Sequence, residues 1–108
     1  MKRVTMGHGA GGELMHELLS LHIIPQFTVE VPLRSFDDSA VVDDIVFTMD
    51  GHTVKPLFFP GGDIGSLAVC GTINDISVMG AQPLALAQSI IIEEGLEIDV
   101  LERAMKSV

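Results

Sequence analysis

The chain has 108 residues, 47% of them apolar, with fifteen acidic and six basic side chains and a formal charge of −9. This acidity disfavours nucleic acid or an anionic membrane as the main partner. The single cysteine, Cys70, excludes a disulfide framework and suits a reducing cytoplasm. A chain of this length is expected to form one domain, residues 1–108, with its own hydrophobic core.

The N-terminal third is predicted to hold a glycine-rich loop and one helix. Residues 4–6 are at most an edge strand, and residues 7–12 form the loop. Apolar residues at helical spacing predict a helix over 13–22, and Pro25 ends it. A strand is expected at 27–33. The loop matches G-x-G-x-x-G, but the strand before it is too short for a dinucleotide site. Its N–H groups could still fold over phosphate, or the loop could be only a helix start.

The rest of the chain predicts one hairpin, one turn, two helices and a further strand. Residues 40–49 indicate a hairpin with Asp43 and Asp44 at its tip, and residues 60–63 form a turn that ends in a helix N-cap. A buried helix is expected at 64–79, a buried strand at 84–92 and a helix from 99 to the last residue. Polar and glycine interruptions exclude a membrane span at 64–92. This order predicts an α/β (α+β) fold, a mixed sheet with helices packed on one face.

Aspartates dominate the middle of the sequence. Seven lie between residues 37 and 75, against Lys55 alone. Asp75 falls within the expected buried helix, where an ionised carboxylate needs a partner. A divalent cation or nearby backbone and solvent could supply it. Asp37-Asp38 and Asp50 end apolar runs, so with Asp75 they could hold a nucleotide-bound Mg²⁺, although each alone is typical of a turn.

Other reactive side chains carry weaker signals. The four histidines form no metal-ligand spacing, and His8 in the glycine loop is the one expected to touch a substrate. Cys70 has apolar neighbours and no basic residue near it in sequence, so a buried structural thiol is expected.

Four segments carry a resemblance to known families. GHGAGG at 7–12, FDDSAV at 36–41 and TMD at 48–50 resemble the ATP-binding superfamily of aminoimidazole ribonucleotide synthetase, the PurM-like proteins. The run PLFFPGGDIG at 56–65, continued by LAVCGTIND at 67–75, resembles more narrowly the HypE family of carbamoyl dehydratases. The likeness extends over essentially the whole chain.

The resemblance implies ATP and Mg²⁺ as cofactors and assigns roles to particular residues. The implied metal ligands are Asp38, Asp50 and Asp75, with Asn74 near them. The glycine loop would close over the phosphates, and Asp63 would serve the helix as cap or ligand. The implied cofactor-binding residues are thus Gly9, Gly11, Gly12, Asp63 and Asn74.

The resemblance also implies an activity and partners. Members of the HypE family use ATP to dehydrate a carbamoyl group, carried on a C-terminal cysteine, to the thiocyanate that supplies cyanide to nickel–iron hydrogenase. The implied partners are a second copy, paired through the sheet in a dimer, a HypF-like carbamoyl donor and a HypC/HypD-like iron carrier. Met49 replaces the usual threonine. Because the family's chains are longer and end in cysteine, this chain is expected to be an N-terminal fragment without the second domain or a catalytic residue.

Three alternatives remain open at this stage. Selenophosphate synthetase would need a reactive cysteine or selenocysteine with a nearby lysine, and residues 4–20 contain none of these. Thiamine-monophosphate kinase shares the Asp-Asp turn but not the run at 56–63. A non-catalytic dimerisation module would bind no Mg-nucleotide.

Overall fold

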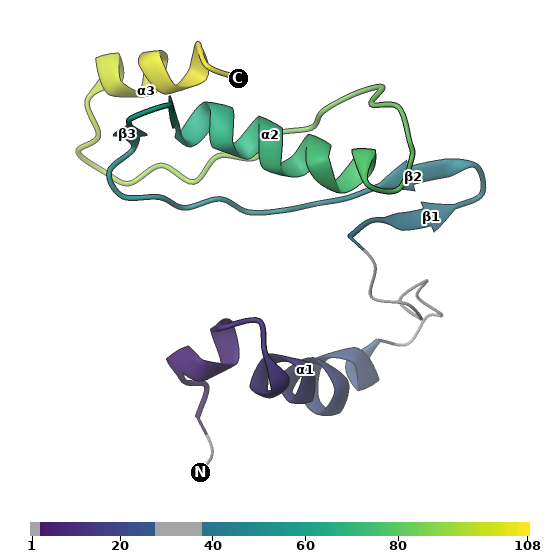
Figure 1. The fold of residues 1–108 in the computed structure, drawn as a ribbon. Helices are drawn as coiled ribbons and strands as arrows, with labels where there is room; N and C mark the ends of the chain where they lie inside the picture. The colour runs from purple at the N-terminus through teal and green to yellow at the C-terminus, as the bar shows by residue number, and fades with distance from the viewer. Residues whose placement is uncertain (1–2, 28–37) are drawn as a thin grey trace. The chain divides into compact units, whose positions relative to one another are not determined.

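The computed structural model describes residues 3–27 and 38–108, and the chain divides into two units, 1–34 and 35–108. Helical elements make up the first unit, and two hairpins followed by two helices make up the second (Figure 1). The α/β class expected from the sequence is confirmed. The strand expected at 27–33 lies, apart from Phe27, outside the described residues, as does Asp37.

The first unit consists of short helical turns. A 3-10 turn, η1 (Met6–Gly9), precedes α1 (Glu13–Leu18), the π-helical η2 (Leu19–Ile23) and the 3-10 turn η3 (Ile24–Gln26). The helix predicted at 13–22 is confirmed, and its second half is a π-helix, which is wider than an α-helix. The edge strand expected at 4–6 is wrong, because Thr5 is tied to the turn that follows. The Thr5 N–H donates to Nδ1 of His8 at 3.0 Å, and the backbone N–H of His8 donates to the Thr5 carbonyl at 3.1 Å.

The second unit begins with the predicted hairpin. Strands β1 (Ala40–Val42) and β2 (Ile45–Phe47) pair antiparallel, with Val42 opposite Ile45. Asp43 in the two-residue turn has φ of 52°, a left-handed conformation that aspartate tolerates better than a β-branched residue. The acidic tip is exposed, as the sequence indicated.

A second, shorter hairpin leads into the long helix. Strands β3 (Phe58–Phe59) and β4 (Gly62–Asp63) pair antiparallel around Pro60 and Gly61, and Gly61 has φ of 92°. Proline followed by glycine suits a turn that needs a positive φ at its second central residue. Helix α2 (Ile64–Ser77) starts directly after it, with Asp63 as the predicted N-cap.

Helix α2 is covered on one side only. Residues on the covered side are half-buried, among them Ala68, Thr72, Asp75 and Ile76. The opposite side exposes Leu67, Cys70, Asn74 and Val78. The all-round burial predicted for this helix is therefore wrong. An apolar helix surface is buried only where another element packs on it, and within the described second unit no element covers this side.

Helix α3 (Ile98–Met105) packs across the first turn of α2 (Figure 1). Gly65 is buried beneath it, and the Arg103 guanidinium lies 3.9 Å from the centre of the Phe58 ring. The predicted C-terminal helix is confirmed, but it ends at Met105 rather than continuing to the last residue.

Residues 84–92 do not form the predicted strand. They run without regular structure, and every one of them is exposed. A strand needs a neighbouring strand to accept and donate its backbone hydrogen bonds. The described strands pair only as β1 with β2 and β3 with β4, so this segment has no such neighbour.

Among the residues that the structure describes, the expected hydrophobic core is also missing. Over residues 3–27 and 38–108 no apolar side chain is fully buried, and large apolar side chains such as Leu84 and Ile91 are almost wholly exposed. In the same residues, no helix combines the length and the hydropathy needed to cross a bilayer.

Candidate nucleotide and metal site

Two hydroxyl side chains tie together the segments that carry the predicted metal ligands. Ser39 Oγ donates to the carbonyl of Asp75 at 2.7 Å, which joins the residue before β1 to the last turn of α2. Thr48 Oγ1 donates to the carbonyl of Asp38 at 3.0 Å. This bond joins the residue after β2 to the residue that precedes Ser39. Asp50 lies two residues after Thr48, so the three aspartates come from segments that meet at one end of α2.

Ser39 is the buried member of this arrangement, with 8% of its surface exposed. Its bond to α2 spans 36 positions in the sequence. A buried hydroxyl without a partner would be costly, and this bond removes that cost while holding β1 against the helix. Sequence reasoning missed both Ser39 and Thr48, because isolated hydroxyl residues carry no periodic or spacing signal.

Both oxygens of the Asp50 carboxylate have neighbours. The Gly51 N–H donates to Oδ1 at 2.7 Å, and Nε2 of His52 lies 3.6 Å from Oδ2. The His52 ring is only 16% exposed, whereas Asp50 is 47% exposed. Sequence reasoning gave His52 no role, because its ring meets α2 at Gly71, a residue 19 positions away.

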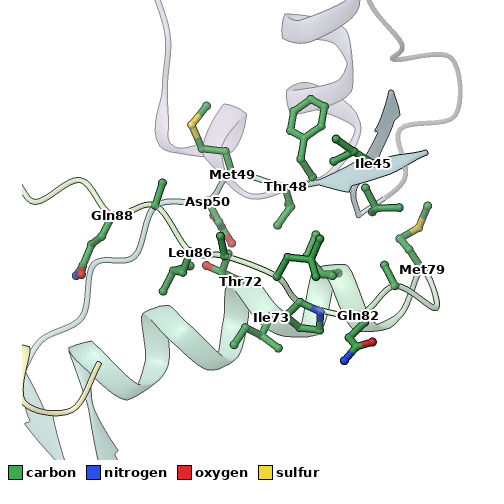
Figure 2. A pocket seen from close by; sticks show the side chains of 18 of the residues that line it. Ile45, Thr48, Met49, Asp50, Thr72, Ile73, Met79, Gln82, Leu86 and Gln88 are labelled. Atoms are coloured by element: carbon green, nitrogen blue, oxygen red, sulfur yellow. The ribbon is translucent and has the colours of Figure 1, made fainter. Parts of the chain in front are cut away.

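Beside these residues lies a cavity of about 1140 Å³. It is bordered by β2 and the residues after it, the second half of α2 and the segment at 79–89. Asp50 and Thr72 are among its polar lining residues, and Figure 2 shows apolar side chains such as Ile45, Ile73 and Leu86 in the same lining. The cavity is thus mainly apolar with a polar part beside Asp50.

The aspartates do not form a closed metal site by themselves. Asp75 is half-buried, while Asp38 and Asp50 are exposed. Within residues 3–27 and 38–108, no three acidic, histidine or cysteine side chains are grouped closely enough to hold an ion. A Mg²⁺ that carries nucleotide phosphates takes only one or two carboxylates and completes its shell with phosphate oxygens and water. Hard carboxylate oxygens on converging segments fit that ion.

Asp63 acts as a cap. Its Oδ1 accepts from the Ser66 N–H at 2.9 Å, and its Oδ2 accepts from the Ser107 hydroxyl. The Ser107 bond and the Ser66 N–H together hold the pKa of Asp63 below its ordinary value. Because both oxygens are engaged, the cap alternative of the sequence analysis is confirmed; its alternative role toward a cofactor stays a prediction.

The predicted loop glycines belong to the first unit. Gly9, Gly11 and Gly12 are exposed, Gly11 has φ of 76° and Gly12 is the residue before α1. A side chain at position 11 would be strained, so glycine suits this turn. His8 serves the η1 turn through its bonds to Thr5. Closure of this loop over phosphate stays a prediction.

Two further residues of α2 can be placed. Asn74, which was expected near the metal ligands, precedes Asp75 and is exposed. Cys70 was expected to be buried, and this is wrong, because it lies on the uncovered side of α2 as a free, exposed thiol. Nothing in the local sequence distinguishes the covered side of this helix from the uncovered one.

The fold and the aspartate-bearing segments are matched by a known family. The family described as "AIR synthase related protein, N-terminal domain" matches residues 36–108, and the chain belongs to it. This confirms the broader of the two resemblances read from the sequence.

Individual relatives show which members of this family the chain is similar to. The chain is 51% identical over 98% of its length to a protein of Methanocaldococcus jannaschii named putative hydrogenase expression/formation protein. It is 44% identical over 98% to carbamoyl dehydratase HypE of Cupriavidus necator, and 35% identical over its whole length to carbamoyl dehydratase HypE of Escherichia coli. The chain spans about a third of the length of these relatives: 34%, 31% and 34%. The narrower resemblance is confirmed as well.

Proposed function

We propose that this chain forms the Mg-ATP-binding part of a HypE-like carbamoyl dehydratase in hydrogenase maturation. The convergence of the Asp38, Asp50 and Asp75 segments, tied through Ser39 and Thr48, is the observation that carries the proposal. The names of the relatives support the reaction class. Bound Mg-ATP would supply the phosphoryl group that turns the carbamoyl oxygen into a leaving group.

The charge of this region supports the proposed metal. Between residues 38 and 75 the chain carries six aspartates and one basic residue, Lys55. A nucleotide triphosphate is itself strongly anionic and would be repelled from this region. A divalent cation held by Asp75 and Asp50, with Asp38 beside them, would bridge protein and phosphate oxygens. The resemblance also gives Asn74 and the glycine loop at Gly9, Gly11 and Gly12 a part in nucleotide binding, and we keep both in this proposal.

The other parts of the reaction belong to the full-length protein. There the chain would work with a second copy, a HypF-like carbamoyl donor and a HypC/HypD-like iron carrier, in the cytoplasm. The 108 residues alone would bind nucleotide without completing a turnover. Exposed apolar side chains at 84–92 support pairing with a further polypeptide surface.

A calorimetric titration of the chain with Mg-ATP tests the metal assignment. We expect saturable binding that requires Mg²⁺ and weakens by about tenfold or more in Asp75→Asn, which removes a charged ligand and changes few atoms. Asp43→Asn at the exposed hairpin tip is the matched control and should bind as the wild type does, since Asp43 does not border the cavity and asparagine tolerates its φ of 52°.

Two results would overturn parts of this proposal. Wild-type affinity in Asp75→Asn would remove Asp75 from the metal site. The complete absence of binding in wild-type chain would instead contradict the nucleotide-binding role and favour the dimerisation module.

A further inference from the structure

The His52 ring connects Asp50 to helix α2. Its Nε2 atom lies 3.6 Å from Asp50 Oδ2, and the same edge of the ring faces Gly71. With 16% of its side chain exposed, the imidazole is held between the segment after β2 and the helix. A ring in this position has lost most of its freedom to turn away from the carboxylate.

Because Gly71 has no side chain, it leaves the space that the His52 ring occupies, here called the His52 seat. A Cβ there would lie 2.6 Å from Nε2 and 3.4 Å from Cε1 of His52, so any larger residue would displace the ring. Position 71 lies one helical turn before Asp75, whose carbonyl accepts the Ser39 bond. The seat is therefore one turn from the place where the aspartate segments converge.

Asp50 itself is exposed and would otherwise be free to rotate. The Gly51 N–H holds Oδ1 at 2.7 Å, and His52 faces Oδ2 at a distance longer than a hydrogen bond but short enough for electrostatic attraction. Together the two contacts favour one side-chain orientation. Ordering a ligand before the metal arrives lowers the entropic cost of binding.

We propose that His52, seated on Gly71, is a positioning residue that holds the Asp50 carboxylate ready for a metal-bound phosphate. The use of Asp50 toward a metal and its phosphate rests on the proposed function. The orientation of Asp50 by His52 is independent of that function, since it is a property of the ligand-free chain. The two parts can therefore be tested separately.

The first test measures the Asp50 side chain in the ligand-free chain. The coupling constants between its Hα and two Hβ protons differ when one rotamer dominates and become similar when rotamers interconvert. We expect different couplings in the wild type and in His52→Gln, whose amide nitrogen retains a donor near the Nε2 position. They should become similar in His52→Phe, which fills the seat without a donor, and in Gly71→Ala, which blocks the seat.

Amide shifts of Ser39 and Thr48 report whether each variant keeps the surrounding fold. Should His52→Phe fail to fold, Gly71→Ala answers the same question, because alanine favours helix. Similar couplings already in the wild type would overturn the proposal. Wild-type couplings in every well-folded variant that lacks the donor would also overturn it, since His52 would then contribute packing alone.

The second test uses Mg-ATP as the probe. We expect affinity to fall by about tenfold in His52→Phe and Gly71→Ala, as for loss of a group that orients a ligand, and to be retained in His52→Gln. Equal affinity in all four proteins would overturn the positioning role. If the wild type binds no Mg-ATP, the proposed function fails, while the couplings still decide whether His52 holds Asp50.

Discussion

Asp63 joins two helices that are distant in the sequence. One carboxylate oxygen caps the first turn of α2 through Ser66, and the other accepts the hydroxyl of Ser107, just after α3. The cap could be read from the Pro-Gly-Gly-Asp turn, because an N-cap is local chemistry. The Ser107 contact could not, because it crosses 44 positions.

We expect Asp63 to make stability depend on acid. Its pKa is lowered from 3.8 in the folded chain, chiefly by the Ser107 hydroxyl, so the folded state retains the ionised form where the unfolded state would take up a proton. The stabilisation is present above about pH 4 and is lost as the pH falls through the lowered pKa. Thermal unfolding between pH 7 and pH 2 should show a steeper fall in midpoint for the wild type than for Asp63→Asn.

Asparagine is an informative replacement here because it still caps a helix but does not ionise. Asp44→Asn, at the exposed hairpin tip, should retain the wild-type acid dependence. If Asp63→Asn and the wild type lose stability in parallel as the pH falls, the contact with Ser107 does not contribute in solution.

At the scale of elements, α2 and α3 approach each other closely at Gly65. Gly65 allows it, since a Cβ there would meet the carbonyl oxygen of Ala104 and lie 3.1 Å from Cβ of Ser107. Arg103 above the Phe58 ring adds a cation–π contact from the same helix. The β3–β4 hairpin, the start of α2 and the end of α3 thus form one local cluster.

Gly65→Ala is expected to separate α3 from α2. Overpacking of this kind costs about 1–3 kcal/mol, because the backbone of one helix must shift. Urea unfolding followed by circular dichroism measures the loss. Gly51→Ala is the control, since a Cβ at that position meets nothing within 4 Å. Equal stability of the two variants would show that the helices do not pack as described.

Helix α2 shows where sequence patterns reach their limit. Its existence, start and approximate end could be predicted from the apolar run, the Asp63 cap and Gly80, which has φ of 74°. Which side is covered could not, because the helix is apolar nearly all round and offers no polar stripe. Cys70 and Asp75 were therefore both expected to be buried, whereas Cys70 is exposed and Asp75 is half-buried.

At the scale of the whole molecule, apolar surface remains uncovered. Over the described residues no apolar side chain is fully buried, and the 84–92 segment is exposed throughout although it is almost continuously apolar. Surface of this kind is a common mark of an interface. The missing strand at 84–92 and the missing core have the same physical cause, the absence of an opposing surface in the described chain.

We expect this segment to drive self-association at micromolar concentration. Ile91 is 100% exposed, and Ile91→Lys should shift sedimentation toward a lighter species by placing a charge where apolar surface would be buried. Met6→Lys changes a residue that is 94% exposed in the first unit and should leave the distribution unchanged. A wild-type chain that sediments as a monomer would contradict this expectation.

Features controlled by local chemistry could be predicted from the amino-acid order alone. The first hairpin, the turn at 60–63, the Asp63 cap and the helix positions were predicted from spacing and turn residues, since those signals act between near neighbours. The family was recognised from the resemblance of short motifs. Three features became visible only in the folded chain: the bonds of Ser39 and Thr48 between the aspartate segments, the contact of His52 with Gly71, and the uncovered side of α2. These depend on contacts between distant segments, because burial and hydrogen bonding require a partner surface that no local pattern specifies.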